Sequence, residues 1–182
     1  MSRAFRRARG GGVSVVLDAA EIQLLHSFTD QVLTMLAGRD DGESVSDELT
    51  RQVGLSSVTE PPDDPVLARL LPTAYLEDEE SAREFRRYTE TDLIRSKRSY
   101  VRTMQRSLDR GPGTIYLDEA EARAWMTALN DVRLALGTRW QITEEDDAEA
   151  YERMAEDDPR RPVLAVYDWL TLLQETLVEA VR

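Results

Sequence analysis

Leu17-Asp18-Ala19-Ala20-Glu21 and Leu117-Asp118-Glu119-Ala120-Glu121 are two copies of one pattern, placed one hundred residues apart. Each copy follows a short β-branched run and opens a segment with apolar residues at helical spacing. In each copy the aspartate can accept hydrogen bonds from backbone N–H groups of the first turn, while the glutamate can accept one from the N–H of the aspartate. The pattern therefore predicts two helices, each beginning directly after a strand.

The repeat divides the chain into two related strand-helix halves, about 1–110 and 113–182. We expect residues 1–182 to form a single domain, because 182 residues suit one domain with a sizeable core. The expected fold is mainly α-helical, a helical bundle with a small antiparallel β-ribbon of two or three strands.

The strands of this ribbon are short. Residues 4–9 and 13–17, separated by Gly10-Gly11-Gly12, are typical of a β-hairpin whose glycines tolerate a tight turn. Residues 113–117 form a matching strand in the second half. None of the three is long enough to be stable alone, so we expect them to pair and to bind the halves together.

Apolar residues at helical spacing predict the helices, and capping residues, glycine and proline mark their ends. The first capped helix is expected to end at Gly38, and the second to lie before Gly137. A long helix is expected to end at Arg110-Gly111-Pro112-Gly113. The expected helices cover residues 18–37, 47–53, 66–71, 79–108, 118–136, 144–155 and 163–181.

The segment 39–64 is poor in apolar residues and rich in Asp, Glu, Ser and Pro. Apart from the short helix at 47–53, we expect it to be a flexible acidic loop.

Charge is distributed unevenly along the chain. The net charge is −12, from 23 basic and 35 acidic residues, which opposes non-specific binding to nucleic acid or to an anionic membrane. Residues 83–110 nevertheless hold nine basic side chains against four acidic ones, and residues 144–158 hold nine acidic side chains against one basic. Both segments are typical of solvated helix faces, or they complement one another within the fold.

The basic segment supplies the candidate partner-binding residues. Tyr88 and Tyr100 lie among its arginines, a mixture that suits a phosphate backbone or an acidic peptide. Arg95, Lys97, Arg98 and Arg102 do not all share one face, because a helix rotates by about 100° per residue and spreads them widely. Internal ion pairs are the alternative. The candidates are Arg87, Arg95, Arg98 and Arg102.

The composition disfavours most kinds of active site. Without cysteine the chain can form no disulfide and no thiolate metal site. His26 is the only histidine and has no cysteine to partner it as a metal ligand, and the glycines do not form a phosphate-binding loop. The run 144–158 has carboxylates for a hard cation but lacks the EF-hand pattern. We expect no cofactor, no catalysis, no membrane span, no secretory signal and a cytoplasmic location.

Residues 128–139, Ala-Leu-Asn-Asp-Val-Arg-Leu-Ala-Leu-Gly-Thr-Arg, are the most unusual stretch of the sequence. Asn130 and Arg133 lie one helical turn apart beside the apolar stripe, where an arginine can hydrogen-bond carboxylates or carbonyls. The stretch is either a polar network that fixes the helix register or a ligand site.

With Trp125 ahead of it, this stretch resembles the signature of an actinobacterial family of unknown function, the AosR-like regulators. Four further segments are similar in order and spacing: Arg3-Ala4-Phe5-Arg6-Arg7, Leu71-Pro72-x-Ala74-Tyr75, Glu84-Phe85-Arg86-Arg87-Tyr88-Thr89-Glu90, and Tyr167-x-x-Leu170 to Gln174-x-x-Leu177. The matching residues of the main signature are Trp125, Leu129, Asn130, Asp131, Arg133, Leu136, Gly137 and Arg139.

The resemblance implies a cytoplasmic regulator without catalytic activity, encoded in many genomes near the ClpS protease adaptor. It implies a role in oxidative-stress transcription, through a protein partner such as a sigma factor and through promoter DNA, with a cysteine pair as redox sensor. This chain has no cysteine, so a thiol–disulfide switch does not transfer to it.

Three hypotheses of function follow. The first is a non-enzymatic regulatory protein that works by protein–protein contacts in stress-linked transcription. The second is a homodimer that binds DNA directly with the basic helix 83–110. The third is a carboxylate metal enzyme that uses the acidic run 144–158.

Overall fold

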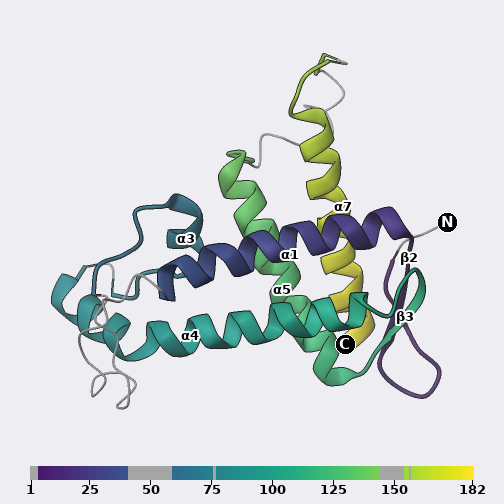
Figure 1. Cartoon of the computed structure of the whole chain (residues 1–182), viewed down its shortest axis with the longest axis horizontal. Helices are drawn as coiled ribbons and strands as arrows, with labels where there is room; N and C mark the ends of the chain where they lie inside the picture. Colours follow the sequence, from purple (N-terminus) through teal and green to yellow (C-terminus); the bar gives the residue numbers. More distant parts are fainter. Residues whose placement is uncertain (1–3, 41–58, 76, 144–153, 156) are drawn as a thin grey trace.

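The computed structural model describes residues 4–40, 59–75, 77–143, 154–155 and 157–182. Long helices make up most of the fold (Figure 1). Two of them run side by side, and two others, packed on one another, cross them steeply. The first pair is α1 (Ala19–Asp40) and α4 (Glu79–Leu108), the second is α5 (Glu119–Arg139) and α7 (Arg161–Val181), and α3 (Pro65–Leu70) is a short helix on α5.

A small antiparallel sheet lies at one end of α1 (Figure 1). Its strands are β1 (Arg6–Arg7), β2 (Val13–Leu17) and β3 (Gly113–Leu117), in the order β1-β2-β3. The central strand pairs Val15 with Ile115, so strands from the two halves are directly joined, as predicted. The first strand is shorter than expected, because only Arg6 and Arg7 of the segment 4–9 pair with β2.

The glycine turn before β2 has a steric reason at one position. Gly12 has φ +73°, and a Cβ atom there would overlap the carbonyl oxygen of Leu117 on β3. Only glycine fits this close approach. The turn therefore sets the distance between the hairpin and the strand of the second half.

Both predicted caps are present. The Asp18 carboxylate accepts from the N–H of Glu21 at 2.9 Å, and the Glu21 carboxylate accepts from the N–H of Asp18 at 2.8 Å. Asp118 and Glu121 exchange the same two bonds, at 2.8 and 3.1 Å. Such a capping box satisfies N–H groups that a helix start leaves open.

Helix α4 ends at Leu108 and α7 at Val181, as predicted, but two other predicted ends were wrong. Gly38 and Gly137 do not end helices, because α1 continues to Asp40 and α5 to Arg139. The end of α5 is formed by Gln141, whose φ is +52°, while Ile142 donates to the carbonyl of Gly137 at 2.9 Å. This is a Schellman ending without glycine.

The core lies where α5 meets the other helices and the sheet. Trp125 is fully buried, packs edge-on against Phe5 at 5.6 Å between ring centroids, and donates its indole N–H to the Ser107 hydroxyl at 2.6 Å. The expected helices 47–53 and 144–155 and most of the loop 39–64 lie outside the described residues. Within the described part of the chain, every helix is too short or too polar to span a bilayer.

Candidate partner-binding surface

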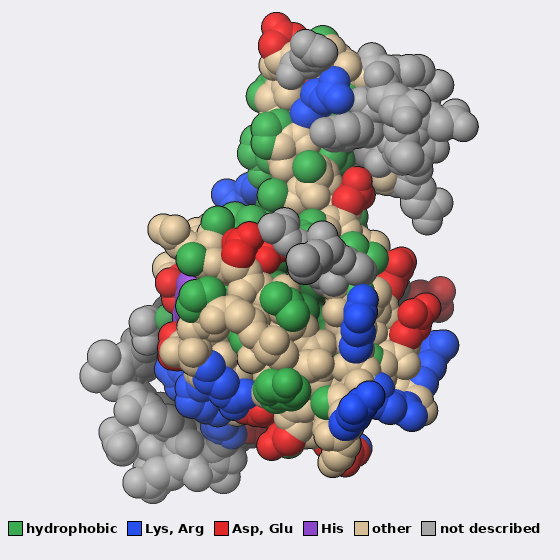
Figure 2. Space-filling view, turned by 90° about the vertical axis from the view of Figure 1, so that its right-hand side faces the viewer, with side chains coloured by type: hydrophobic (Ala, Val, Ile, Leu, Met, Phe, Trp, Pro, Cys, Tyr) green, Lys and Arg blue, Asp and Glu red, His purple; other side chains and the backbone are tan. Residues whose placement is uncertain are grey.

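The four candidate arginines lie along one side of α4. Arg87, Arg95 and Arg102 are exposed and Arg98 is half-buried. Since successive helix residues are rotated by about 100°, these positions fall within roughly a quarter of the helix circumference. Figure 2 shows Lys and Arg side chains in the lower half of the molecule, with Asp and Glu side chains beside them. The arginines therefore form an outward basic face.

Other basic residues of the segment 83–110 form ion pairs within the chain. Lys97 turns away from the basic face, and its Nζ lies 2.6 Å from Oδ1 of Asp131 on α5. Arg83 pairs with Glu60 at 3.0 Å, and Arg110 pairs with Glu121 of the second cap. Internal ion pairing thus accounts for Lys97, Arg83 and Arg110, while Arg87 and Arg102 are exposed on the outward side of α4.

A buried ion cluster lies under the N-terminal half of α4. Glu90 accepts from Arg39 of α1 at 2.8 Å and from Arg86 of its own helix. Arg86 also donates to the Thr73 hydroxyl at 2.9 Å and to the carbonyl of Leu71 at 3.4 Å. Arg86 and Glu90 are both buried, so this pairing is needed to offset their loss of solvation.

Sequence reasoning did not single out this cluster. Two signals were present: Arg86 and Glu90 are four residues apart on one helix, and they lie in the segment 84–90 that resembles the family. That spacing is common on solvated helix faces, and the partners that make the cluster buried come from distant parts of the chain.

The residues of α5 that match the family signature are called the α5 motif from here on. One of them, Asp131, is almost fully buried. Its Oδ1 accepts from Lys97, but its Oδ2 has no hydrogen-bond partner among the described residues. Burial raises the pKa of Asp131 above its ordinary value, and the hydrogen bond and positive charge of Lys97 oppose this shift. The carboxylate links α5 to α4.

Two further motif residues hold α7. Arg133 donates from Nε to the Thr171 hydroxyl at 3.1 Å, and its guanidinium lies 5.4 Å from the centre of the Tyr167 ring. Gly137 lies against the same ring, where an added Cβ would be 3.3 Å from Cε2. Asn130, in contrast, is exposed and takes no part in this network. These contacts fix the register between α5 and α7.

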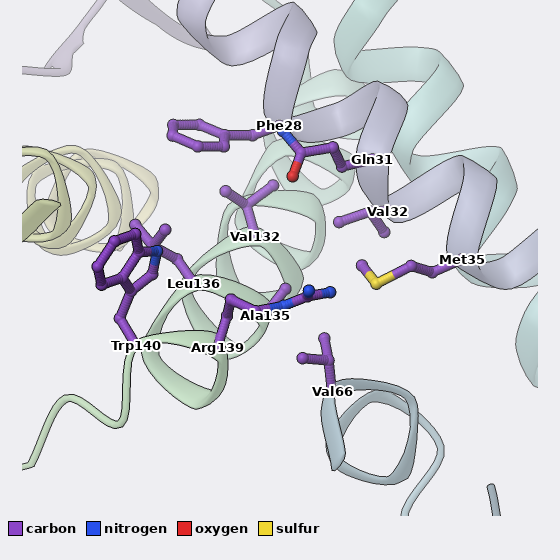
Figure 3. Close-up of a pocket in the computed structure, with 10 residues that line it drawn as sticks. All are labelled: Phe28, Gln31, Val32, Met35, Val66, Val132, Ala135, Leu136, Arg139 and Trp140. Carbon is purple, nitrogen blue, oxygen red and sulfur yellow. The ribbon is translucent and has the colours of Figure 1, made fainter. Parts of the chain in front are cut away.

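Two other motif residues, Leu136 and Arg139, line a pocket of about 260 Å³ between α1, α3 and α5 (Figure 3). Its walls are mostly apolar. Trp125 and Leu129, the remaining motif residues, belong to the core. The motif thus divides between packing positions and a surface pocket.

The other candidate groups carry little chemistry. His26 lies 3.3 Å from Asp109, a contact between α1 and the end of α4. No group of three or more metal-ligating side chains occurs among the residues that the structure describes. Most of the acidic run 144–158 lies outside those residues.

Comparison with known proteins supports the predicted resemblance. A family model described as a domain of unknown function (DUF2017) matches residues 2–181. A Mycobacterium leprae protein named AosR is 33% identical over 187 residues, covering 95% of this chain and 84% of that protein. The Mycobacterium tuberculosis protein named oxidative stress regulator AosR is 33% identical over 172 residues, covering 87% and 77%. No solved structure matches. The chain therefore belongs to the DUF2017 family and is a relative of these mycobacterial proteins.

Proposed function

We propose that this protein is a non-enzymatic regulator, linked to oxidative stress, that acts by binding another protein through the basic face of α4. The outward side of α4 carries the proposal, because it concentrates Arg87, Arg95, Arg98 and Arg102 on a chain whose net charge is −12. The names of the relatives support the regulatory role.

The spacing of these arginines favours an acidic partner. Arg87, Arg95 and Arg102 are exposed on one side of α4, and like charges gathered on one face repel one another. Asp92 pairs with Arg95, but both side chains are largely exposed, where such pairs contribute little. Carboxylates of a partner would relieve the repulsion and add bidentate hydrogen bonds. A transcription component such as a sigma factor is the partner that the family resemblance implies.

The proposed regulator does not use a thiol switch, because the chain has no cysteine. Its activity is expected to depend on charge instead. Binding between oppositely charged surfaces weakens as salt screens them.

The test is capture of a partner from an actinobacterial lysate with tagged protein at low and high salt, followed by binding measurements with the purified partner. Combined Arg87→Glu and Arg102→Glu substitutions should abolish capture. Combined Arg69→Glu and Arg123→Glu substitutions change the charge equally at exposed sites outside the basic face and should leave capture intact. Equal binding by both variants would show that α4 is not the contact surface.

Direct DNA binding by a homodimer is the second candidate, because the same arginines could contact phosphates. It predicts an electrophoretic shift of duplex DNA that is lost on changing Arg95, Arg98 and Arg102 to alanine, with affinity falling steeply as salt rises. The net charge of −12 opposes this mode, so we expect no shift.

A further inference from the structure

The pocket between α1, α3 and α5 has one charged group and otherwise nearly apolar walls (Figure 3). It lies apart from the basic face of α4 and shares no residue with it. Its volume of about 260 Å³ corresponds to about nine groups the size of a water molecule. The lining residues are Phe28, Gln31, Val32, Met35, Val66, Val132, Ala135, Leu136, Arg139 and Trp140.

The two ends of the pocket differ in character. Arg139 extends along Ala135, and its guanidinium points between Met35 and Val66 (Figure 3). No described carboxylate lies within ion-pairing distance of this guanidinium. At the other end the lining is apolar and partly aromatic, with Phe28 and Trp140.

We propose that this pocket binds a small amphipathic carboxylate. The carboxylate would pair with the Arg139 guanidinium, whose planar fork matches two carboxylate oxygens. The apolar body would lie between Phe28 and Trp140. An aliphatic acid of about eight carbons fits the volume.

The shape favours a small molecule over a protein segment. Small-molecule sites are concave and mostly apolar, with a few polar groups that orient the ligand. Stable protein interfaces bury about 800 Å² on each partner, far more than ten lining residues around a small cavity provide. The proposal does not depend on the proposed function, since the two surfaces can be tested separately.

Octanoate and 1-octanol are matched probes for the test, because they share an apolar chain and differ in charge. Binding to the full chain would be followed by the NMR signal of the Trp140 indole N–H, below the concentration at which octanoate forms micelles. We expect saturable shifts with octanoate. The affinity should fall about fourfold for each methylene removed, and therefore in two such steps for hexanoate.

Arg139→Gln should weaken octanoate binding by about tenfold or more and leave octanol binding unchanged. Arg69→Gln, on the exposed side of α3, is the matched control and should change neither. Ala135→Leu narrows the pocket and should weaken both probes, with circular dichroism confirming the fold.

Two results would overturn the proposal. One is the absence of a saturable Trp140 shift with octanoate, including the case in which only an acidic amphipathic peptide produces it, which would assign the pocket to a protein partner. The other is an equal loss of octanoate and octanol binding in Arg139→Gln, which would show that the guanidinium does not recognise the carboxylate.

Discussion

At the scale of single residues, the α5 motif combines side chains with different tasks. Asp131 faces α4, Arg133 and Gly137 face α7, and Arg139 faces the pocket. Such a division requires a helix with neighbours on several sides, which is the position of α5. Most of the motif is therefore explained by helix packing, and the exposed Asn130 and the pocket residue Arg139 are not.

Gly137 offers a direct test of packing against helix propensity. Alanine in place of a helical glycine normally stabilises by about 0.5–1 kcal/mol. At Gly137 the new methyl group would press on the Tyr167 ring, and the Arg133 guanidinium, which lies over this ring, restricts its movement. We expect Gly137→Ala to bring no stabilisation, as measured by urea unfolding.

Gly38 is the matched control, because it also lies inside a helix and an added Cβ there meets nothing within 4 Å. Gly38→Ala should stabilise by about 0.5 kcal/mol. An equal gain at both glycines would show that Tyr167 yields freely and that Gly137 has no packing role.

Asp131 predicts a specific dependence of stability on pH. Because its pKa is raised in the folded protein, the folded state binds the proton more tightly than the unfolded state. Proton binding at Asp131 therefore adds to the free energy of unfolding. This contribution is fully present below the ordinary pKa of 3.8 and is lost as pH rises through the folded-state pKa. Urea unfolding across this range should therefore show wild type losing stability relative to Asp131→Asn as pH rises.

Asp78 provides a control of opposite sign. Hydrogen bonds from the hydroxyl and N–H of Ser81 lower its pKa, so its contribution is present above 3.8 and is lost as pH falls through the folded-state pKa. Wild type should lose stability relative to Asp78→Asn as pH falls through that range. If Asp131→Asn followed the same trend as Asp78→Asn, the pairing with Lys97 would lower the pKa of Asp131 by more than burial raises it.

At the scale of elements, the capped starts of α1, α4 and α5 were predictable from sequence, and so was the end of α4 at Leu108, but the ends of α1 and α5 were not. The starts of α1, α4 and α5 depend on local hydrogen bonds between residues three apart, as in Asp118 and Glu121, so the sequence contains the full signal. Helix α7 has no side-chain cap, and its start was predicted two residues late. The end of α5 depends on Gln141 adopting a positive φ, which the sequence does not indicate. Gly137 was misinterpreted because its reason, the Tyr167 ring, comes from a distant helix.

The α5 ending predicts a stabilising substitution. Gln141 has φ +52°, a conformation that glycine adopts without the steric penalty of a Cβ atom. Gln141→Gly should raise the free energy of unfolding by about 0.5–1 kcal/mol. Gln141→Ala keeps the Cβ and should show no such gain. Thermal unfolding of both variants checks the result, and a loss of stability in Gln141→Gly would mean that its side chain contributes more than the strain costs.

At the scale of the whole molecule, the candidate surfaces differ in how far sequence could predict them. Composition identified the basic helix, but not which of its residues face inward. Lys97 faces inward because it pairs with Asp131, and Arg86 because it donates to Leu71 and Thr73. Only the tertiary fold brings these partners near. For the pocket, the sequence offered only a ligand site as one interpretation of residues 128–139, because its walls come from three helices of both halves.

The last prediction concerns the two halves, which we propose fold as one domain. Strand β2 of the first half pairs with β3 of the second, and α5 packs on both α1 and α7. Leu129→Ala in the core of α5 should lower the free energy of unfolding by about 2–5 kcal/mol. If the chain unfolds as one unit, hydrogen exchange in α1 and α7 should accelerate equally, and calorimetric and van't Hoff enthalpies should agree. Unchanged protection in α1 would instead show that the repeat of the capped helix marks two independently folding units.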